Sequence, residues 1–321
     1  MKKGFVYKMV FGKQKSDDFT SDNLPVTRRQ QFFALFKSRF GIFFRANLLC
    51  APFWVLLLIW DMLAAGYVDT FTQNMSAAEK FSHLINLTLL RYGTDSILLG
   101  LASVGLAGVF YLARKLCWGQ PVKVFHDFID GIKRSWKQFF LIGLLLGLFV
   151  ALMEYLISVC SLTMSADNAF LWTSAICLCY VAMIIALIIA MFAFAQASLY
   201  NVTTSKLFLN SFALTFKKLL SSLGIVCITA VPMIVCWFLP WVLAKLIVLC
   251  LALTVGICYA VAVQTEFCLY VFDRYINAKE YPDFVGMGLR DGKSFLEVTD
   301  QSAREEGSET STDDVRTEEE V

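Results

Sequence analysis

An uncharged run of 31 residues, from Phe170 to Tyr200, limits what this chain can fold into more than any other feature. A helix of that length rises about 46 Å, which exceeds the hydrocarbon core of a bilayer, about 30 Å thick. The composition agrees, because 58% of the residues are apolar and only 17% are charged, against about 25% charged in soluble proteins. The sequence therefore predicts an integral membrane protein.

Six segments are apolar enough and long enough, at roughly 20 residues, to cross a bilayer as helices. They lie at about residues 42–65, 95–116, 139–162, 170–199, 219–240 and 243–271. This pattern predicts an all-α, polytopic membrane protein whose six transmembrane helices form three hairpins. The connections within each hairpin would face one side of the membrane, and the connections between hairpins the other.

Lysine and arginine are distributed unevenly among the connecting segments. All 28 except Lys80, Arg91 and Lys245 lie before the first span, between hairpins, or after the last span. Because cationic loops are retained in the cytoplasm, the distribution predicts a multi-pass protein of the plasma membrane with both termini cytoplasmic.

The chain is predicted to have three parts. Residues 1–30 form a cytoplasmic N-terminal segment, and residues 31–275 form the six-span membrane domain. Residues 276–321 form a cytoplasmic acidic tail, which is predicted to be largely disordered from about residue 291. From that point the chain is rich in Ser, Thr and acidic residues and has few large apolar side chains, so it cannot bury enough surface to fold.

A short pattern recurs three times, each time just before an odd-numbered span. A Phe is followed four residues later by Phe or Ile and then directly by Lys, which suggests an internal repeat of three hairpins. Apolar residues on one face and cations on the other predict an amphipathic helix lying in the membrane interface before each hairpin, with membrane lipid as its partner. The predicted interfacial anchors are Phe32, Phe36, Lys37, Phe128, Ile132, Lys133, Arg134, Trp136, Phe212, Phe216 and Lys217.

Basic residues interleaved with aromatics also occur on nucleic-acid-binding surfaces. Here the aromatics fall on one helical face and each segment leads directly into a span. The pattern therefore predicts a membrane interface and no nucleic-acid partner.

Polar side chains inside the predicted spans are candidates for function, because they are costly in lipid. Glu154 continues a face of small residues formed by Gly143, Gly147 and Ala151, which is typical of close helix packing. Its carboxylate is either a proton or cation site, or a structural group that is hydrogen-bonded or reaches outer water. Three further residues complete the candidate intramembrane polar site: Glu266, Gln196 and Gln264.

The same two kinds of explanation apply to these three residues. Glu266 lies close to the cytoplasmic end of the last span, where it either forms a site or pairs with a basic interfacial residue. Gln196 and Gln264 are suited to hydrogen bonds between helices, which is the ordinary use of such side chains in membranes.

Motifs for catalysis and for metal binding are lacking in the sequence. There is no Ser-His-Asp context, phosphate-binding glycine loop, HExxH or CxxC, and the chain has only two histidines. The sequence therefore predicts that the protein is not an enzyme and has no cofactor and no metal site.

Two segments carry a family resemblance: RRQQFFALFKSRFGIFFRANLL from Arg28, and AGVFYLARKLCWGQPVKVFHDFIDGIKRSWKQ from Ala107. They resemble the YesL-like family of small bacterial integral membrane proteins, some of which are linked with carbohydrate uptake and utilisation. The chain departs from the family in the first hairpin, where members commonly have a Leu-Pro-x-x-Thr turn. The resemblance implies a setting in the membrane and supplies no catalytic residue.

Two functions follow as hypotheses. The first is a non-enzymatic accessory or scaffold protein that binds another membrane protein, such as a carbohydrate-uptake transporter. The alternative is a small transporter or channel that uses the intramembrane carboxylates of Glu154 and Glu266.

Overall fold

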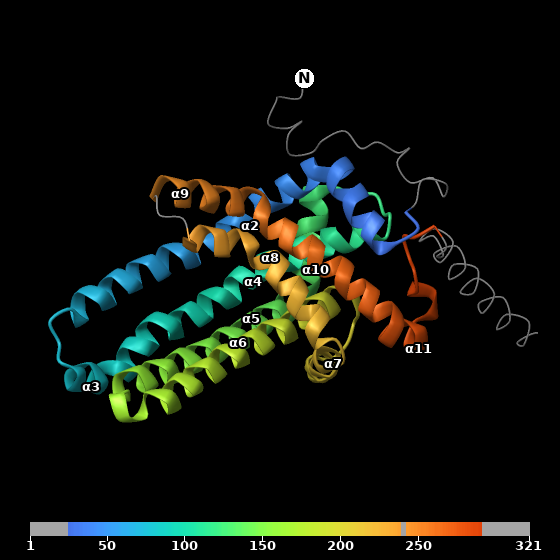
Figure 1. The fold of residues 1–321 in the computed structure, drawn as a ribbon. Helices are drawn as coiled ribbons and strands as arrows, with labels where there is room; N and C mark the ends of the chain where they lie inside the picture. Colours follow the sequence, from blue (N-terminus) through green and yellow to red (C-terminus); the bar gives the residue numbers. More distant parts are fainter. Residues whose placement is uncertain (1–24, 239–241, 291–321) are drawn as a thin grey trace, which may run out of the picture.

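The computed structural model describes residues 25–238 and 242–290, and within these ranges every regular element is a helix (Figure 1). The all-α prediction is thereby confirmed. Most of the N-terminal segment, the tail from residue 291 and the turn at Pro240 lie outside the described residues.

The first hairpin consists of a very long helix followed by two joined ones. Its elements are α2 (Arg28–Thr72), α3 (Ala77–Thr88), the π-helix η3 (Leu89–Gly93) and α4 (Thr94–Cys117). The α2 helix begins where the Thr27 hydroxyl accepts a hydrogen bond from the Gln30 amide at 3.3 Å, and it continues through Pro52. At the start of α3, Ser76 and Glu79 cap each other reciprocally, so the sequence defines where this helix begins.

The second hairpin consists of two long helices joined by a short turn. It consists of α5 (Val124–Thr163), the 3-10 turn η4 (Ala166–Asn168) and α6 (Ala169–Leu199). In Figure 1 these helices run side by side with α4 toward the end of the molecule at which α3 lies. The α4 and α5 backbones approach closely, because a Cβ atom on Gly147 would lie 2.6 Å from the Cα of Ser96, and one on Gly143 would collide with Ser103.

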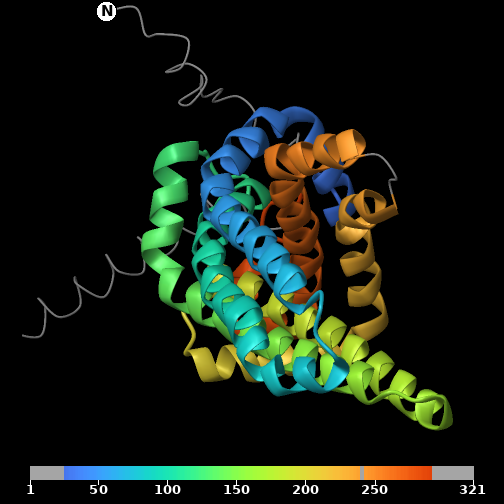
Figure 2. The same cartoon turned by 90° about the vertical axis from the view of Figure 1, so that its left-hand side faces the viewer.

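The third hairpin and the C-terminal segment are built from shorter helices. They comprise α7 (Thr204–Lys217), α8 (Leu219–Phe238), α9 (Val242–Leu251), η5 (Ala252–Gly256), α10 (Ile257–Phe272), η6 (Asp273–Asn277), α11 (Ala278–Glu280) and η7 (Pro282–Phe284). The α7 and α8 helices meet at an angle of 97°. In Figure 2, α10 runs between α2 and α4 on one side and α8 on the other, in agreement with its contacts.

Five helical segments of the described chain are long and apolar enough to cross a membrane. They are Arg39–Thr72, Ala78–Cys117, Val124–Thr163, Ala169–Leu199 and Ile247–Glu280. The bent pair Thr204–Lys217 and Leu219–Val231 makes a sixth when it is taken as one span. The chain is thus a multi-pass membrane protein. The third interfacial segment is a separate helix, α7, whereas the first two are the N-terminal parts of α2 and α5.

The core lies where α4, α5, α6 and α10 meet, and aromatic rings fill it. Phe139 packs against Phe194 with ring centroids 5.0 Å apart and against Phe110 at 5.8 Å. All three side chains are buried. The apolar side chains of α6 that face away from this core are exposed, among them Leu178, Val181 and Leu187. This exposure is expected of a helix solvated by lipid.

Candidate functional site

A buried polar cluster joins the two described ends of the chain at one end of the helix bundle. Its charged centre is Arg28, at the first turn of α2, whose guanidinium donates to the Asp273 carboxylate at 2.9 Å and to the Met287 carbonyl at 3.0 Å. A third bond runs from the same guanidinium to Gln31 Oε1 at 2.9 Å. The Arg28 side chain is only 9% exposed, so this charge is stabilised by its partners and not by water.

Gln31 extends the cluster to the end of α4. Its amide nitrogen donates to the Gly288 carbonyl at 3.2 Å and also to the Cys117 carbonyl. Gly288 has φ +82°, and a Cβ atom at this position would overlap the Cys117 carbonyl. Only glycine therefore allows residues 287–288 to lie this close to α4.

A second branch of the cluster leads from Asp273 to the connection after α6. The other Asp273 oxygen accepts from the Asn277 amide at 2.8 Å, and Asn277 Oδ1 accepts from the Tyr200 hydroxyl at 2.5 Å. Burial is the main cause that raises the pKa of Tyr200, which keeps its hydroxyl protonated and able to donate. The cluster therefore connects α2, η6 and the α6–α7 connection through buried hydrogen bonds.

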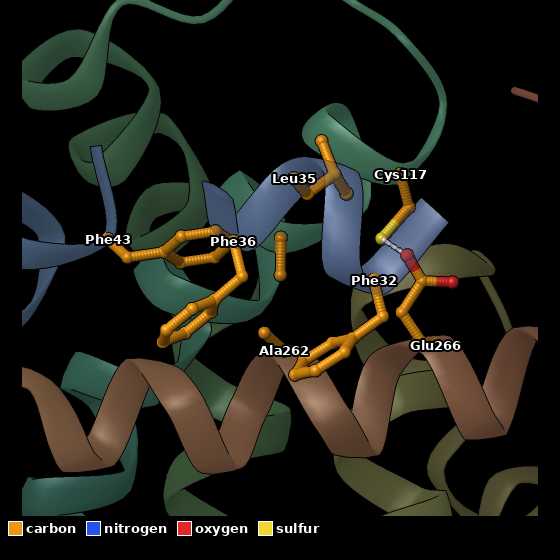
Figure 3. Close-up of a pocket in the computed structure, with 8 residues that line it drawn as sticks. Phe32, Leu35, Phe36, Phe43, Cys117, Ala262 and Glu266 are labelled. Carbon is orange, nitrogen blue, oxygen red and sulfur yellow. Dashed lines mark hydrogen bonds between the residues drawn. The ribbon is translucent and has the colours of Figure 1, made fainter. Parts of the chain in front are cut away.

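Glu266 lies beside this cluster, next to a small apolar cavity (Figure 3). The Cys117 thiol donates to Glu266 Oε1 with Sγ and Oε1 3.3 Å apart. Glu266 Oε2 is buried and has no hydrogen-bond partner in residues 25–238 and 242–290. Arg28 is a cation whose charge acts on this carboxyl. Glu266 therefore lies close enough to feel the charge of Arg28, but the ion pair of Arg28 is with Asp273.

The cavity has a volume of about 10 Å³, which is room for about one water molecule and not for a sugar. Its lining residues come mainly from the start of α2: Phe32, Leu35, Phe36, Phe43, Ala113, Cys117, Ala262 and Glu266. A water molecule there could satisfy Glu266 Oε2, or the carboxyl could carry a proton. The geometry therefore allows two states of Glu266, a carboxylate bound to water or a protonated carboxyl.

Glu154 lies at the other end of the molecule. It is half-buried in α5, and its charge acts on Tyr92 while the Arg91 charge acts on it. Arg91 itself forms an ion pair with Asp61 at 3.2 Å. Glu154 thus faces residues just before α4, and Glu266 contacts the last residue of α4, a helix of 24 residues or about 36 Å. The structure does not bring the two carboxylates together.

The small residues that precede Glu154 on α5 differ in their surroundings. Gly143 and Gly147 are buried against α4, whereas Ala151 is half-buried. Glu154 therefore lies where the close α4–α5 contact opens toward η3.

The two glutamines have separate structural surroundings. Gln196 is buried in the last turn of α6 and donates to the Ser211 hydroxyl of α7 at 2.9 Å. Next to it, Arg114 donates to the Ser198 carbonyl at 2.9 Å and Ser135 to the Ala197 carbonyl at 3.2 Å. These bonds satisfy carbonyls that the end of α6 leaves unpaired. Gln264 is half-buried in α10 and is not part of the Arg28 cluster.

The predicted interfacial anchors do not share one environment. Phe32, Phe36 and Ile132 are half-buried, and Phe128 is buried directly against Gly108 instead of facing lipid. The outward-facing side chains are Lys37, Lys133, Arg134, Trp136, Phe212, Phe216 and Lys217. Close helix packing explains the difference, because Gly108 leaves a space on α4 that the Phe128 ring fills.

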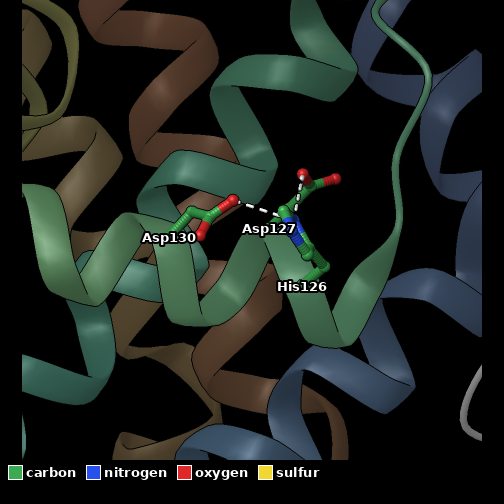
Figure 4. Close-up of side chains that lie close together, drawn as sticks. All are labelled: His126, Asp127 and Asp130. Atoms are coloured by element: carbon green, nitrogen blue, oxygen red, sulfur yellow. Dashed lines mark ion pairs between the residues drawn. The ribbon is translucent and has the colours of Figure 1, made fainter.

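One group of side chains in the described residues has the spacing of a metal site. His126, Asp127 and Asp130 place ligand atoms within 4.8 Å of one another at the start of α5 (Figure 4). Both Asp127 oxygens are already used, one by the Lys115 ammonium at 2.9 Å and the other by the Lys123 amide at 2.6 Å. These contacts describe a helix N-terminus that is capped and neutralised.

Several residues of the cluster escape sequence-based reasoning. Arg28 and Gln31 precede the first span, so the sequence predicts that they are solvated. Cys117 has the sequence context of a small packing residue. Asn47 gives a clearer signal, since it is polar within an apolar run. It is fully buried and accepts from the Cys258 amide at 2.7 Å, which supports the π-helix η5 in the last span.

Comparisons with protein-family models, with curated proteins and with solved structures gave no match to this chain. The geometry of the site itself therefore carries the functional argument.

Proposed function

We propose that this multi-pass membrane protein is a non-enzymatic accessory or scaffold subunit of a larger membrane complex, such as a carbohydrate-uptake system. We further propose that it resides in the plasma membrane with both termini cytoplasmic. The observation that carries the proposal is the buried Arg28 cluster, which joins both described ends of the chain over the end of α4.

The buried polar groups of the cluster hold the start of α2 against η6 and residues 287–288. Burying Arg28 and Asp273 costs several kcal/mol of desolvation, and an apolar pair would give as much stability. What the ion pair adds is a defined geometry, reinforced by the bond from the Arg290 amide to the Pro25 carbonyl at 3.0 Å. Pro25 and Arg290, the two described ends of the chain, are therefore held side by side on one surface, an arrangement suited to holding a partner.

Two features support the membrane complex as the partner. The first is the resemblance to the YesL-like family, some members of which are linked with carbohydrate uptake. The second is the predicted cytoplasmic orientation, which would place the platform and both terminal segments on the side where cytoplasmic subunits of uptake systems assemble.

Purification of the tagged full-length chain in mild detergent tests this role. We expect a membrane complex to co-purify, and a deletion strain to lose part of its carbohydrate uptake. Arg28→Met should reduce co-purification at least tenfold, whereas Arg29→Met, which changes the exposed neighbour, should not. Retrieval of no membrane partner, together with normal uptake in the deletion strain, contradicts the proposal.

A small transporter or channel is the second candidate, and it is favoured by the Glu266 oxygen that has no hydrogen-bond partner among the described residues. In that case the carboxyl would carry a proton or cation past the cavity. The chain reconstituted in liposomes would then show ion or solute flux that Glu266→Gln abolishes and Glu154→Gln alters. Flux that is absent, or indifferent to both substitutions, eliminates this candidate.

A further inference from the structure

Three cationic side chains converge on one aromatic ring at the corner between α7 and α8. The Nζ atoms of Lys217 and Lys218 lie 5.3 and 5.7 Å from the centre of the Tyr275 ring. The guanidinium carbon of Arg274 lies 5.9 Å from the same point. Any two of these charges are therefore less than about 12 Å apart. The cation–π attraction of a single ring is too weak to offset the repulsion among three cations.

None of the three cations forms an ion pair with a carboxylate in the part of the chain that the structure describes. The acid nearest in sequence is Asp273, but its two oxygens are engaged by Arg28 at 2.9 Å and by Asn277 at 2.8 Å. Like charges this close repel, most strongly near a surface of low dielectric constant. An anion between them would turn this repulsion into attraction.

The surface beside the three cations is strongly apolar. Leu220, at the start of α8, is 84% exposed, and Phe216, in the last turn of α7, is 54% exposed. The Phe216 ring packs on Phe212 with centroids 4.8 Å apart, and Phe212 is also exposed. The apolar helix α8 begins directly after this corner, since only Lys218 separates it from α7 and the two helices meet at 97°.

From this charge complementarity and the adjoining apolar face we infer that the α7–α8 corner, with Arg274 and Tyr275, is a binding site for one anionic phospholipid. The phosphate group lies among Lys217, Lys218 and Arg274. The acyl chains follow Phe216 and Leu220 toward α8. This inference is independent of the proposed scaffold role, because it concerns a different surface of the molecule.

Native mass spectrometry of the full-length chain, purified in a neutral detergent, tests the site. The protein is mixed with equal amounts of phosphatidylglycerol and phosphatidylcholine. We expect wild type to retain phosphatidylglycerol preferentially, and each of Lys217→Gln, Lys218→Gln and Arg274→Gln to weaken that retention by about fivefold. Lys217→Arg with Lys218→Arg keeps the charge and should keep the lipid, which separates loss of the site from loss of the fold.

The matched control is the triple substitution Arg29→Gln, Lys123→Gln and Lys137→Gln, which removes three exposed cations that are neither part of the Tyr275 cluster nor predicted interfacial anchors. It should leave phosphatidylglycerol retention within twofold of wild type. Equal loss in this control would overturn the proposal by showing a general effect of charge. The proposal would also be overturned if the wild-type protein showed no preference for the anionic lipid, as expected if an acidic protein binds at this site instead. Displacement of the lipid by millimolar inorganic phosphate would also overturn it.

Discussion

At the start of α2, Phe32 and Phe36 pack against α10, whereas the equivalent Phe212 and Phe216 of α7 face outward. The Phe36 ring lies 5.8 Å from that of Tyr259 in α10, while Phe212 and Phe216 contact mainly each other and are each more than half exposed. The two segments share one sequence pattern. A pattern of this kind defines the apolar face of a helix, but not whether protein or lipid covers it.

The two segments have different neighbours in the bundle. The first turns of α2 lie beside α10, where Phe32 and Phe36 pack against Tyr259 and the buried core. The α7 helix makes an angle of 97° with α8, and its Phe212 and Phe216 side chains are exposed. Substitutions in these two segments, and beside them, test this contrast.

Arg28→Met should destabilise the protein by about 3–5 kcal/mol, because it leaves the buried Asp273 carboxylate without its ionic partner. Arg29→Met, one residue further on the exposed side of α2, should change the free energy of unfolding by less than about 0.5 kcal/mol. Denaturant titration of both variants in mixed micelles measures the difference. Equal stability of the two variants would mean that the first turn of α2 is not held to η6.

Phe36→Ala should cost about 2 kcal/mol, since it removes a half-buried ring from the cavity wall and from its contact with α10. Phe216→Ala, at the matching position of α7, should cost about 0.5 kcal/mol or less in a detergent micelle. The same titrations measure both. If Phe216→Ala were the more damaging change, the outward orientation of the α7 face would be refuted.

Lys217→Gln should weaken phosphatidylglycerol retention by about fivefold, as derived for the lipid site. Lys37→Gln, the matching position before the first span, should leave it unchanged within twofold, because Lys37 does not join the Tyr275 cluster. Native mass spectrometry of both single variants gives the ratio. A similar loss in both would make the two segments equivalent in lipid binding.

Glu266→Gln should have the smallest effect, less than about 0.5 kcal/mol, because the amide oxygen still accepts from the Cys117 thiol. The side chain lies beside the first interfacial segment, where α2 covers the cavity. A loss of about 3 kcal/mol would instead show that an ionised Glu266 stabilises Arg28. The unfolding titration distinguishes these outcomes directly.

Much of the fold follows from local composition. The apolar segments and the caps at Thr27 and Ser76 depend on residues close together in the chain. The helices nevertheless run beyond the predicted spans, as α2 does from Arg28 to Thr72. The Gly143–Gly147 face of α5 is also visible in the sequence, since small residues four apart share one side of a helix.

The candidate site could not be predicted from local sequence. Arg28, Gln31, Cys117, Glu266 and Asp273 are distant in the sequence, and Arg28 has the appearance of an ordinary solvated cation. Their meeting depends on α2, α4 and α10 ending at the same level, which no periodicity encodes. The separation of Glu154 from Glu266 likewise depends on which end of α4 each helix meets.

The sequence by itself determined that this chain is a helical membrane protein, because the solvation of 20-residue apolar segments is a local property. It also determined which face of each interfacial segment is apolar. Only the tertiary structure decided what each face meets: α10 for the start of α2, Gly108 for Phe128, and the outside for α7. The physical reason is that burial depends on neighbours brought together by helix packing, and three similar patterns met three different neighbours.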